Sequence, residues 1–266
     1  DLPGALMGVR SLGIKGCSVS MPFKQAVLPF LDKIDDIAKN IGSVNTIVNH
    51  NGMLCGYNTD FIGAKKVLKS INICSNDRVL LLGAGGVARA LLYALRHFGC
   101  NQVYISNRNQ EKILSLNHIM PFKSVAWENK SNIFPDVIIN ATCVGMAPLN
   151  DSCPVDLRTI SACKSVFDVI VTQLDTPLIS SARSLGKIVL PGYLMSLEQA
   201  VQQFRLYTGE EPPRAVMQEN LEQLLSNLFA SFFAPPRQGP WDDGYRKAPA
   251  ATSKKLANNF PRKRRI

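Results

Sequence analysis

The sequence lacks the features of a metal-binding or disulfide-stabilised protein. Among its 266 residues there are only three histidines, none near another, and seven scattered cysteines that never form a C-x-x-C pair. This pattern argues against a zinc site and against a disulfide framework, and it favours a reducing compartment. We therefore expect a cytoplasmic protein without a bound metal, in which the cysteines are small buried apolar residues.

An apolar run long enough to span a membrane is also missing. The nearest candidate, VLLLGAGGVARALLYAL, is punctuated by glycines and carries Arg89. The chain begins DLPGALMGVR, which is not a basic segment followed by an apolar one. We therefore expect neither a transmembrane helix nor a signal peptide. An apolar content of 46% and a charged content of 19% are instead ordinary for a globular enzyme.

Acidic residues are fewer than basic ones, and most of this imbalance comes from the C-terminal end of the chain. Residues 234–266 contain nine Lys or Arg and two Asp or Glu, a net charge of +7 out of +10 for the whole chain. The rest of the chain is nearly neutral, which argues against a nucleic-acid partner for the folded part. We interpret residues 233–266 as a disordered basic tail. The alternative is a polyanion-binding segment that ends in PRKRRI.

Short apolar runs alternate with helical patterns between residues 76 and 192. The run VLLL precedes a glycine cluster and a helix, and VYISNR, DVIINAT, SVFDVIV and KIVLPG are the later predicted strands. A helix is predicted to start at Thr176, with Pro177 in its first position and Gly186 at its end. This alternation predicts an α/β protein with a Rossmann-type, doubly wound parallel sheet.

The remaining segments are expected to form a smaller α/β part. Residues 1–69 contain predicted strands around 16–20 and 43–49, separated by the helical segment PFLDKIDDIAKNIG. After Gly192, SLEQAVQQFRLYTG and PPRAVMQENLEQLLSNLFASFF are predicted helices without strands of their own. We expect residues 193–232 to return to residues 1–69 and pack on them.

The glycine cluster fits the G-x-G-x-x-A pattern of a dinucleotide-binding turn. It lies directly between a predicted strand and a predicted helix, whose N-terminus offers N–H donors to a pyrophosphate. The residues concerned are Gly83, Ala84, Gly85, Gly86, Val87 and Ala88. The alternative is a tight turn in an α/β domain that binds no nucleotide.

No acidic residue ends the next predicted strand, where NAD-binding proteins usually carry one. The strand ends in Asn107, Arg108 and Asn109, and Lys112 follows one helical turn later. An arginine can form a charge-assisted fork with a 2′-phosphate, so we expect NADP rather than NAD. The alternative is that Asn109 caps a helix and Arg108 is merely exposed.

Seven short motifs together resemble the shikimate dehydrogenase family, over residues 4 to 230. In chain order they are S-V-S-M-P-F-K, G-S-V-N-T, G-Y-N-T-D, G-A-G-G-x-A-R, N-R, N-A-T-x-x-G-M and L-E-Q-A-x-x-x-F. Each motif is weak alone, but their order and spacing make the set specific. The resemblance implies a two-domain, NADP-dependent oxidoreductase that acts on a hydroxylated cyclohexene carboxylate.

The resemblance also implies roles for individual residues. Lys24 and Asp60 match the acid–base pair of the family, and Asn45 and Gln199 match side chains that hold substrate hydroxyls. Ser20 matches the side chain that holds a carboxylate or a hydroxyl. The residues implied to lie beside the nicotinamide are Asn140, Ala141, Thr142, Gly145, Met146 and Gly192.

Taken singly, these polar residues have simpler interpretations. A lysine after a strand is usually a solvated surface charge. Asp60 is equally typical of a helix cap, and Asn45 and Asn58 are typical of turns. The resemblance, rather than any one motif, therefore carries the catalytic interpretation.

The sequence departs from the family pattern in three places. It has no initial strand with an S-x-S segment, so we expect weak or no activity if Asp1 is the true start. It has S-V-S-M-P-F-K where N-V-T-x-P-x-K is more usual, as in a shikimate-dehydrogenase-like branch. Val171 stands where a tyrosine is common.

We expect reduction of 3-dehydroshikimate, or a close ring-hydroxy acid, by a monomer or homodimer. The alternatives are a quinate-type or other polyol-acid dehydrogenase, and a non-enzymatic NADP-binding protein with a polyanion-binding tail.

Overall fold

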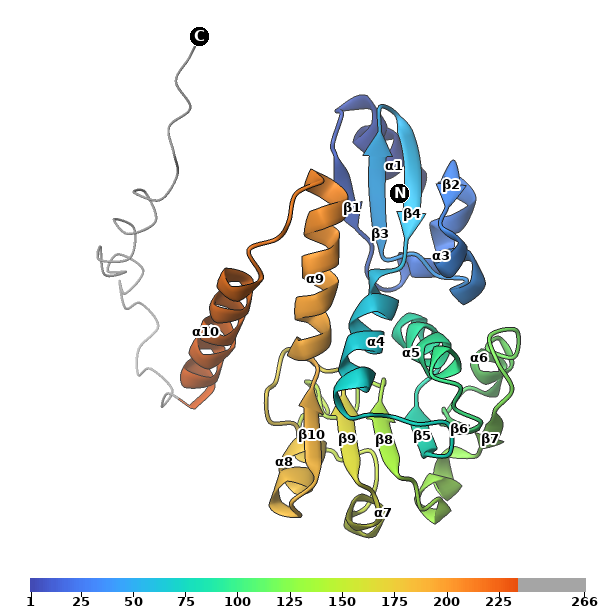
Figure 1. The fold of residues 1–266 in the computed structure, drawn as a ribbon, viewed down its shortest axis with the longest axis vertical. Helices are drawn as coiled ribbons and strands as arrows, with labels where there is room; N and C mark the ends of the chain where they lie inside the picture. The colour runs from blue at the N-terminus through green and yellow to red at the C-terminus, as the bar shows by residue number, and fades with distance from the viewer. Residues whose placement is uncertain (234–266) are drawn as a thin grey trace. The chain divides into compact units, whose positions relative to one another are not determined.

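The computed structural model describes residues 1–233, with side chains described as far as residue 225. Asp1–Asn227 form one compact unit, which contains both sheets. The basic tail expected over residues 233–266 lies outside the described residues, apart from its first residue. Figure 1 shows the arrangement of the helices and strands.

The larger sheet has six strands, and every pair of neighbours is parallel. In spatial order the strands are β10 (Ile188–Pro191), β9 (Ser165–Asp168), β8 (Val137–Asn140), β5 (Arg78–Leu82), β6 (Gln102–Ser106) and β7 (Lys123–Val125). Read from β7, this is the 3-2-1-4-5-6 order of a dinucleotide-binding fold, whose switch point lies between β5 and β8. The predicted α/β class and parallel sheet are confirmed.

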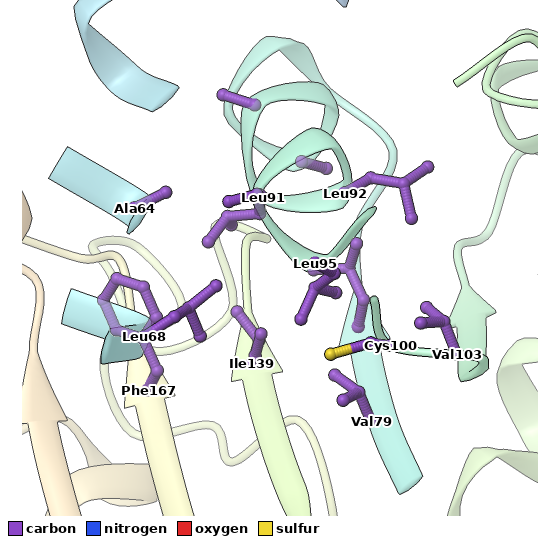
Figure 2. Close-up of a cluster of buried hydrophobic side chains, with 14 of the residues drawn as sticks. Ala64, Leu68, Val79, Leu91, Leu92, Leu95, Cys100, Val103, Ile139 and Phe167 are labelled. Atoms are coloured by element: carbon purple, nitrogen blue, oxygen red, sulfur yellow. The ribbon is translucent and has the colours of Figure 1, made fainter. Parts of the chain in front are cut away.

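Helices cover both faces of this sheet. The elements concerned are α5 (Gly86–His97), α6 (Gln110–Leu114), η2 (Trp127–Asn132), α7 (Leu157–Ala162) and α8 (Pro177–Ser184). Successive strand side chains point to opposite faces, so Val79 packs in the cluster of α5 and α6 while Leu80 packs in that of α7 and α8. Figure 2 shows the first cluster, in which Leu91 and Leu95 lie above Ile139. This packing holds the carboxyl ends of β5, β6 and β8 in a rigid frame.

The predicted start of α8 is confirmed in detail. The side-chain oxygen of Thr176 accepts a hydrogen bond from the Ile179 N–H, and Pro177 is the first helical residue. Gly186 follows the end of the helix with a φ of +68°, which glycine adopts at little cost.

The smaller sheet has four strands in the order β1-β3-β4-β2. They are β1 (Gly16–Ser18), β2 (Lys33–Ile34), β3 (Thr46–His50) and β4 (Met53–Tyr57). β3 pairs antiparallel with β1 and β4, and β2 pairs parallel with β4. Around this sheet lie α1 (Leu2–Ser11), α2 (Phe23–Ala26), η1 (Leu28–Phe30) and α3 (Asp36–Ile41).

The prediction of one helix over PFLDKIDDIAKNIG is wrong in its first half. The chain is extended at Leu31, and the Asp32 carboxylate accepts a hydrogen bond from the Leu54 N–H at 2.7 Å. The segment then forms β2, and α3 starts only after Asp35, whose side chain caps it. Cross-strand bonding to β4 therefore overrides the helical pattern, whereas the predicted helix end at Gly42, with a φ of +68°, is confirmed.

Three further helices complete the described chain: α4 (Thr59–Ser70), α9 (Tyr193–Thr208) and α10 (Arg214–Phe233). α4 and α9 lie side by side between the two sheets (Figure 1). Their approach is close at Gly63, where an added Cβ would lie 2.6 Å from the Met195 carbonyl oxygen. The predicted division into residues 1–69, 76–192 and 193–232 as functional domains stays a prediction.

A buried carboxylate connects these three helices. Glu198 of α9 accepts hydrogen bonds from Lys66 of α4 and Arg214 of α10. Burial raises the pKa of Glu198, but these two cations outweigh burial and leave that pKa below its ordinary value. The ion pairs fix α9, which presents side chains to the site described next.

Candidate functional site

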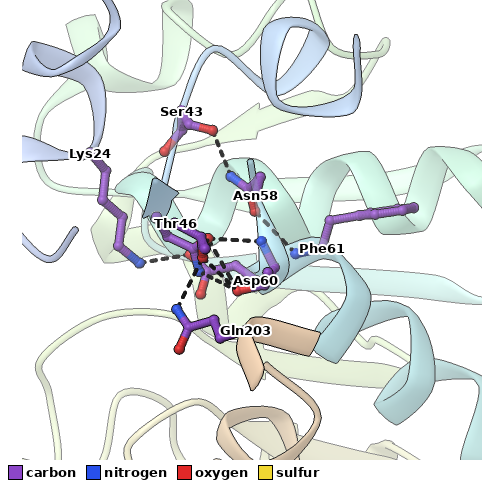
Figure 3. A network of polar contacts seen from close by, with 9 residues as sticks. Lys24, Ser43, Thr46, Asn58, Asp60, Phe61 and Gln203 are labelled. Atoms are coloured by element: carbon purple, nitrogen blue, oxygen red, sulfur yellow. Dashed lines mark hydrogen bonds and ion pairs between the residues drawn. The ribbon is translucent and has the colours of Figure 1, made fainter. Parts of the chain in front are cut away.

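Lys24 and Asp60 form an ion pair at the junction of the two sheets. Their Nζ and Oδ2 atoms are 2.6 Å apart, and the side chains are 11% and 3% exposed. Lys24 comes from α2 and Asp60 from the first turn of α4, so residues 36 positions apart meet here (Figure 3). Exclusion of water strengthens such a pair and fixes its geometry.

The helix-capping interpretation of Asp60 is wrong, because Asn58 caps α4. The Asn58 side-chain oxygen accepts a hydrogen bond from the Phe61 N–H at 3.1 Å. The Asn58 amide group also donates to the Ser43 carbonyl at 2.8 Å, which joins α4 to the segment before β3. With the cap supplied by Asn58, the Asp60 carboxylate is available to Lys24.

Asn45 is held by the first residues of β3 and α4. Its Oδ1 accepts hydrogen bonds from the Thr59 N–H and the Thr46 hydroxyl, both at 2.8 Å. Its Nδ2 donates to the Thr59 hydroxyl at 3.0 Å. An amide nitrogen carries two hydrogens, so one donor hydrogen of Asn45 remains available to a ligand.

These side chains line a cavity of about 340 Å³, within the range of small-molecule sites. Of the predicted residues it contains Ser20, Lys24, Asn45, Asp60, Val87, Gly192 and Gln199. The lining residues not assigned a role from the sequence are Ser18, Val19, Val169, Val171, Met195, Ser196, Ala200 and Gln203. The structure thus brings the predicted acid–base and substrate residues into one cavity and adds a second glutamine.

The glycine-rich turn connects β5 to α5. Gly83 has a φ of +107°, and an added Cβ would lie 2.6 Å from the Ala141 carbonyl oxygen, so only glycine fits. Around a Cβ added to Gly85 there is no atom within 4 Å. α5 has no side-chain cap at its N-terminus. The turn is therefore open at Gly85, and no side chain caps the first N–H groups of α5, which suits an anion.

Gly86 brings this turn against the ion pair. A Cβ added at Gly86 would lie 3.1 Å from the Lys24 Cδ and 3.5 Å from the Ser43 hydroxyl oxygen. The Lys24 stem therefore packs on the first residue of α5.

The loop after β8 is organised by the buried Asn140 amide. Its Oδ1 accepts hydrogen bonds from the Thr142 N–H and hydroxyl, and its Nδ2 donates to the Val144 carbonyl and to Asp168. Gly145 has a φ of +100°, as a tight turn requires. Asn140 thus shapes the loop that contains Ala141, while Met146 follows the turn.

Asp168 lies at the end of β9 behind this loop. Burial raises the pKa of the Asp168 carboxyl to about 6, although hydrogen bonds from Thr176, Asn140 and the Ile170 N–H oppose the shift. β9 ends at Asp168 rather than at Val171 as predicted. The Asp168 side chain accepts a hydrogen bond from the Ile170 N–H, and the chain turns there.

The predicted 2′-phosphate residues lie outside the cavity, after β6. Arg108 and Lys112 are exposed. Asn109 caps α6 by accepting the Lys112 N–H at 3.1 Å, as the alternative interpretation proposed, and Asn107 donates to the Asn109 carbonyl. Both cations are thus free to meet a ligand at this end of the sheet.

Within residues 1–233, no helix is long and apolar enough to cross a membrane. In the same part of the chain, no group of three or more His, Cys, Asp or Glu is placed to hold a metal ion.

Comparison with known proteins identifies similar chains over most of this one. Three family models match: the shikimate dehydrogenase substrate binding domain over residues 1–47, shikimate/quinate 5-dehydrogenase over 64–146, and the shikimate 5′-dehydrogenase C-terminal domain over 192–222. A shikimate dehydrogenase-like protein of Haemophilus influenzae is 36% identical over 82% of this chain and 81% of its own. Shikimate dehydrogenase (NADP(+)) of Moorella thermoacetica is 34% identical over 85% and 80%.

Solved structures agree with these relatives. Shikimate 5-dehydrogenase of Thermus thermophilus, in complex with NADP(H) and shikimate, has a TM-score of 0.73 and 32% identity over 84% of this chain and 83% of its own. Quinate dehydrogenase of Corynebacterium glutamicum, in complex with NAD, has a TM-score of 0.77 and 32% identity over 85% and 83%.

Proposed function

Because the chain belongs to the shikimate dehydrogenase family, we propose that it interconverts 3-dehydroshikimate and shikimate with NADP as cofactor. The resemblance expected from the motifs is confirmed, and the chain is an oxidoreductase. The observation that carries the specific reaction is the ion pair of Lys24 and Asp60 in the wall of the cavity.

Reduction of a ring ketone requires a hydride at the carbonyl carbon and a proton at the carbonyl oxygen. NADPH, when bound, supplies the hydride. The Lys24 ammonium donates the proton to the developing alkoxide, which yields the alcohol and leaves a neutral amine that regains a proton from water. Asp60 orients Lys24 by accepting a hydrogen bond from its ammonium group. Oxidation of shikimate reverses each transfer.

Polar side chains around the ion pair suit a polyhydroxy ring. In this proposal, Asn45 donates its remaining amide hydrogen to a substrate hydroxyl, Gln199 binds another, and Ser20 holds the carboxylate or a hydroxyl. Residues 1–69 and 193–232 then form the substrate-binding part, and residues 76–192 the NADP-binding part. Buried polar groups of this kind reject substrates that lack the matching hydroxyl.

The glycine-rich turn fits the pyrophosphate of NADP. The open space at Gly85 and the uncapped N-terminus of α5 offer backbone donors to it. Arg108 and Lys112 are exposed beyond β6, where we place the 2′-phosphate. The loop from Asn140 to Met146 and Gly192 then lie toward the nicotinamide.

NADPH absorbance provides the test. The purified chain should oxidise NADPH with 3-dehydroshikimate and reduce NADP with shikimate. A Lys24→Met variant should lose turnover, while a matched Lys69→Met variant on the exposed side of α4 should keep it. Absence of turnover with every ring-hydroxy acid of a panel would refute the proposed reaction.

A quinate-type activity is the second candidate, because a solved quinate dehydrogenase is as similar in sequence as a shikimate enzyme. The same assay with quinate, and with NAD in place of NADP, separates the two. Turnover of quinate with a higher kcat/KM than shikimate would favour this second candidate. The oligomeric state and the cytoplasmic location stay predictions.

A further inference from the structure

Arg89, near the start of α5, is a buried cation to which the reaction proposed above gives no role. Its side chain belongs to a residue that is only 5% exposed. Within residues 1–225 no carboxylate forms an ion pair with it, and its pKa is lowered by burial alone. A charge that is buried without an opposite charge costs free energy unless neutral groups hydrogen-bond to it. The neutral groups around Arg89 therefore determine what this residue contributes.

The guanidinium group of Arg89 donates to oxygen atoms of three different segments. Nη2 lies 2.7 Å from the hydroxyl oxygen of Ser115, at the end of α6, and Nη1 lies 3.4 Å from the carbonyl oxygen of Ile41, at the end of α3. Nε and Nη2 both lie 3.0 Å from one side-chain atom of Gln25 in α2. Because a guanidinium can only donate, that atom is the Gln25 oxygen. Arg89 thus joins α5 to α2, α3 and α6.

The contact with Gln25 matters because α2 depends on its neighbours for its position. α2 has four residues, none of them buried, and no side chain caps it, so it has little stability of its own. The Val44 N–H donates to the Lys24 carbonyl at 2.8 Å, and the Lys24 stem packs on Gly86 of α5. Gln25 comes directly after Lys24, and Arg89 comes three residues after Gly86. α5 therefore holds α2 at two points, once through the Lys24 stem and once through the Gln25 amide.

The contact with Ser115 connects the same guanidinium group to the expected cofactor residues. The Ser115 hydroxyl donates its hydrogen to the Lys112 carbonyl at 2.7 Å, so its oxygen accepts from Arg89. Lys112 lies in α6, beside which we place the 2′-phosphate. Arg89 thus connects the helix that carries the proton donor with two helices of the NADP-binding part.

We propose that Arg89 is a positioning residue that holds α2, and with it the Lys24 ammonium group, in place against the cofactor turn. This inference rests on the proposed function, because it requires Lys24 to deliver a proton to the carbonyl oxygen. A displacement of about 1 Å in a reacting group can lower the rate about 100-fold. Arg89 does not line the cavity, so it acts through Gln25 and α2 rather than on the substrate.

Replacement of Gln25 is the first test, because this residue is exposed and its loss should not unfold the chain. Gln25→Leu removes the acceptor, whereas Gln25→Glu keeps an acceptor of similar size for the guanidinium. We expect Gln25→Leu to lower kcat about 5- to 50-fold and to change the Kd of NADPH less than about twofold. Gln25→Glu should restore kcat to within about threefold of wild type.

Replacement of Arg89 itself is the second test. Arg89→Met should also lower kcat, and its combination with Gln25→Leu should lower kcat by less than the product of the two single effects, because both variants remove one contact. Arg96→Met is the matched control: Arg96 lies on the same helix but donates to the Ile119 carbonyl, within the NADP-binding part. This control should keep the kcat of wild type.

Cofactor titration separates positioning from folding. Fluorescence titration counts the NADPH sites per chain, which report the folded fraction. A positioning role lowers kcat per NADPH site, whereas a purely structural role lowers the number of sites and leaves kcat per site unchanged. Unchanged kcat per site in Gln25→Leu, or failure of Gln25→Glu to restore it, would overturn the proposal.

Failure of the proposed function would appear differently. Wild type would then turn over no ring-hydroxy acid, which would overturn both proposals together. Turnover by wild type that depends on neither Gln25 nor Arg89 would overturn this one alone.

Discussion

Replacement of Lys24 by methionine tests the ion pair most directly. Methionine keeps the part of the stem that packs on Gly86, so the cofactor turn loses little contact. The ammonium is lost, and Asp60, which is 3% exposed, remains as a buried carboxylate without its partner. The variant should therefore have a lower kcat and a lower free energy of unfolding, for different reasons.

The two losses have separate magnitudes. A positioned acid–base group contributes about 10²–10⁴-fold to rate, so kcat should fall by that factor, or about 3–5 kcal/mol in activation free energy. Removal of one partner from a buried pair costs about 3–5 kcal/mol of stability. That cost is a large part of a typical total of about 5–15 kcal/mol, so the inactive variant also risks being partly unfolded.

A double variant separates these effects. Lys24→Met combined with Asp60→Asn removes both charges and leaves no unpaired one, so the free energy of unfolding should recover most of the loss. Turnover should not recover, because no proton donor has been restored. Urea unfolding measures the first quantity, NADPH oxidation the second, and NADPH fluorescence the affinity for cofactor, which should stay within about threefold of wild type. A double variant with kcat within about tenfold of wild type would refute the acid–base role, and undiminished stability of Lys24→Met would refute the buried pair.

Further predictions concern the cofactor turn, the expected 2′-phosphate site and pH. Gly83→Ala should lower the free energy of unfolding by about 1–3 kcal/mol, as urea unfolding can measure, because Gly83 has a φ of +107°. Gly85→Ala should instead fold normally and bind NADP at least about tenfold more weakly, as a fluorescence titration can measure. Arg108→Ala should weaken binding of NADP about tenfold or more but leave that of NAD unchanged, and equal losses for both cofactors would contradict the assignment. The pKa of Asp168 is raised by burial from 3.8 to about 6, so its contribution to stability is present below pH 3.8 and lost as pH rises through 6. Relative to Asp168→Asn, wild type should therefore lose about 2 kcal/mol in free energy of unfolding between about pH 4 and pH 7, and a constant difference would show that Asp168 does not titrate as expected.

Sequence patterns predicted the parallel sheet better than the smaller one. Buried strands such as Arg78–Leu82 are continuous apolar runs bounded by turn residues, and their packing agrees with their local preference. The two-residue strand Lys33–Ile34 is too short to produce a pattern. It exists because β4 pairs with it and Asp32 bonds across to Leu54, and neither contact is visible in local sequence.

Only the site residues that belong to the family motifs could be predicted from the sequence. Residue types and spacing alone left Lys24 as a surface charge and Asp60 as a cap, and only the family resemblance joined them. Gln203 was missed, although a signal existed: it lies four residues after Gln199 on one amphipathic helix, so the two share a face. Its hydrogen bond to the Thr46 hydroxyl could not be predicted, because Thr46 lies more than 150 residues earlier in the chain.

The contact between Lys24 and Gly86 explains why two separate motifs form one site. A ketone is reduced only when hydride and proton reach opposite ends of the same C–O bond, so their sources must be held at a fixed separation. Here the charged end of Lys24 is fixed by Asp60, and its stem is fixed by the first residue of α5. The helix whose N-terminus is open to a pyrophosphate therefore also positions the proton donor. A side chain larger than hydrogen at Gly86 would press on Lys24. The packing of Lys24 therefore requires glycine at this position, independently of the conformation of the turn.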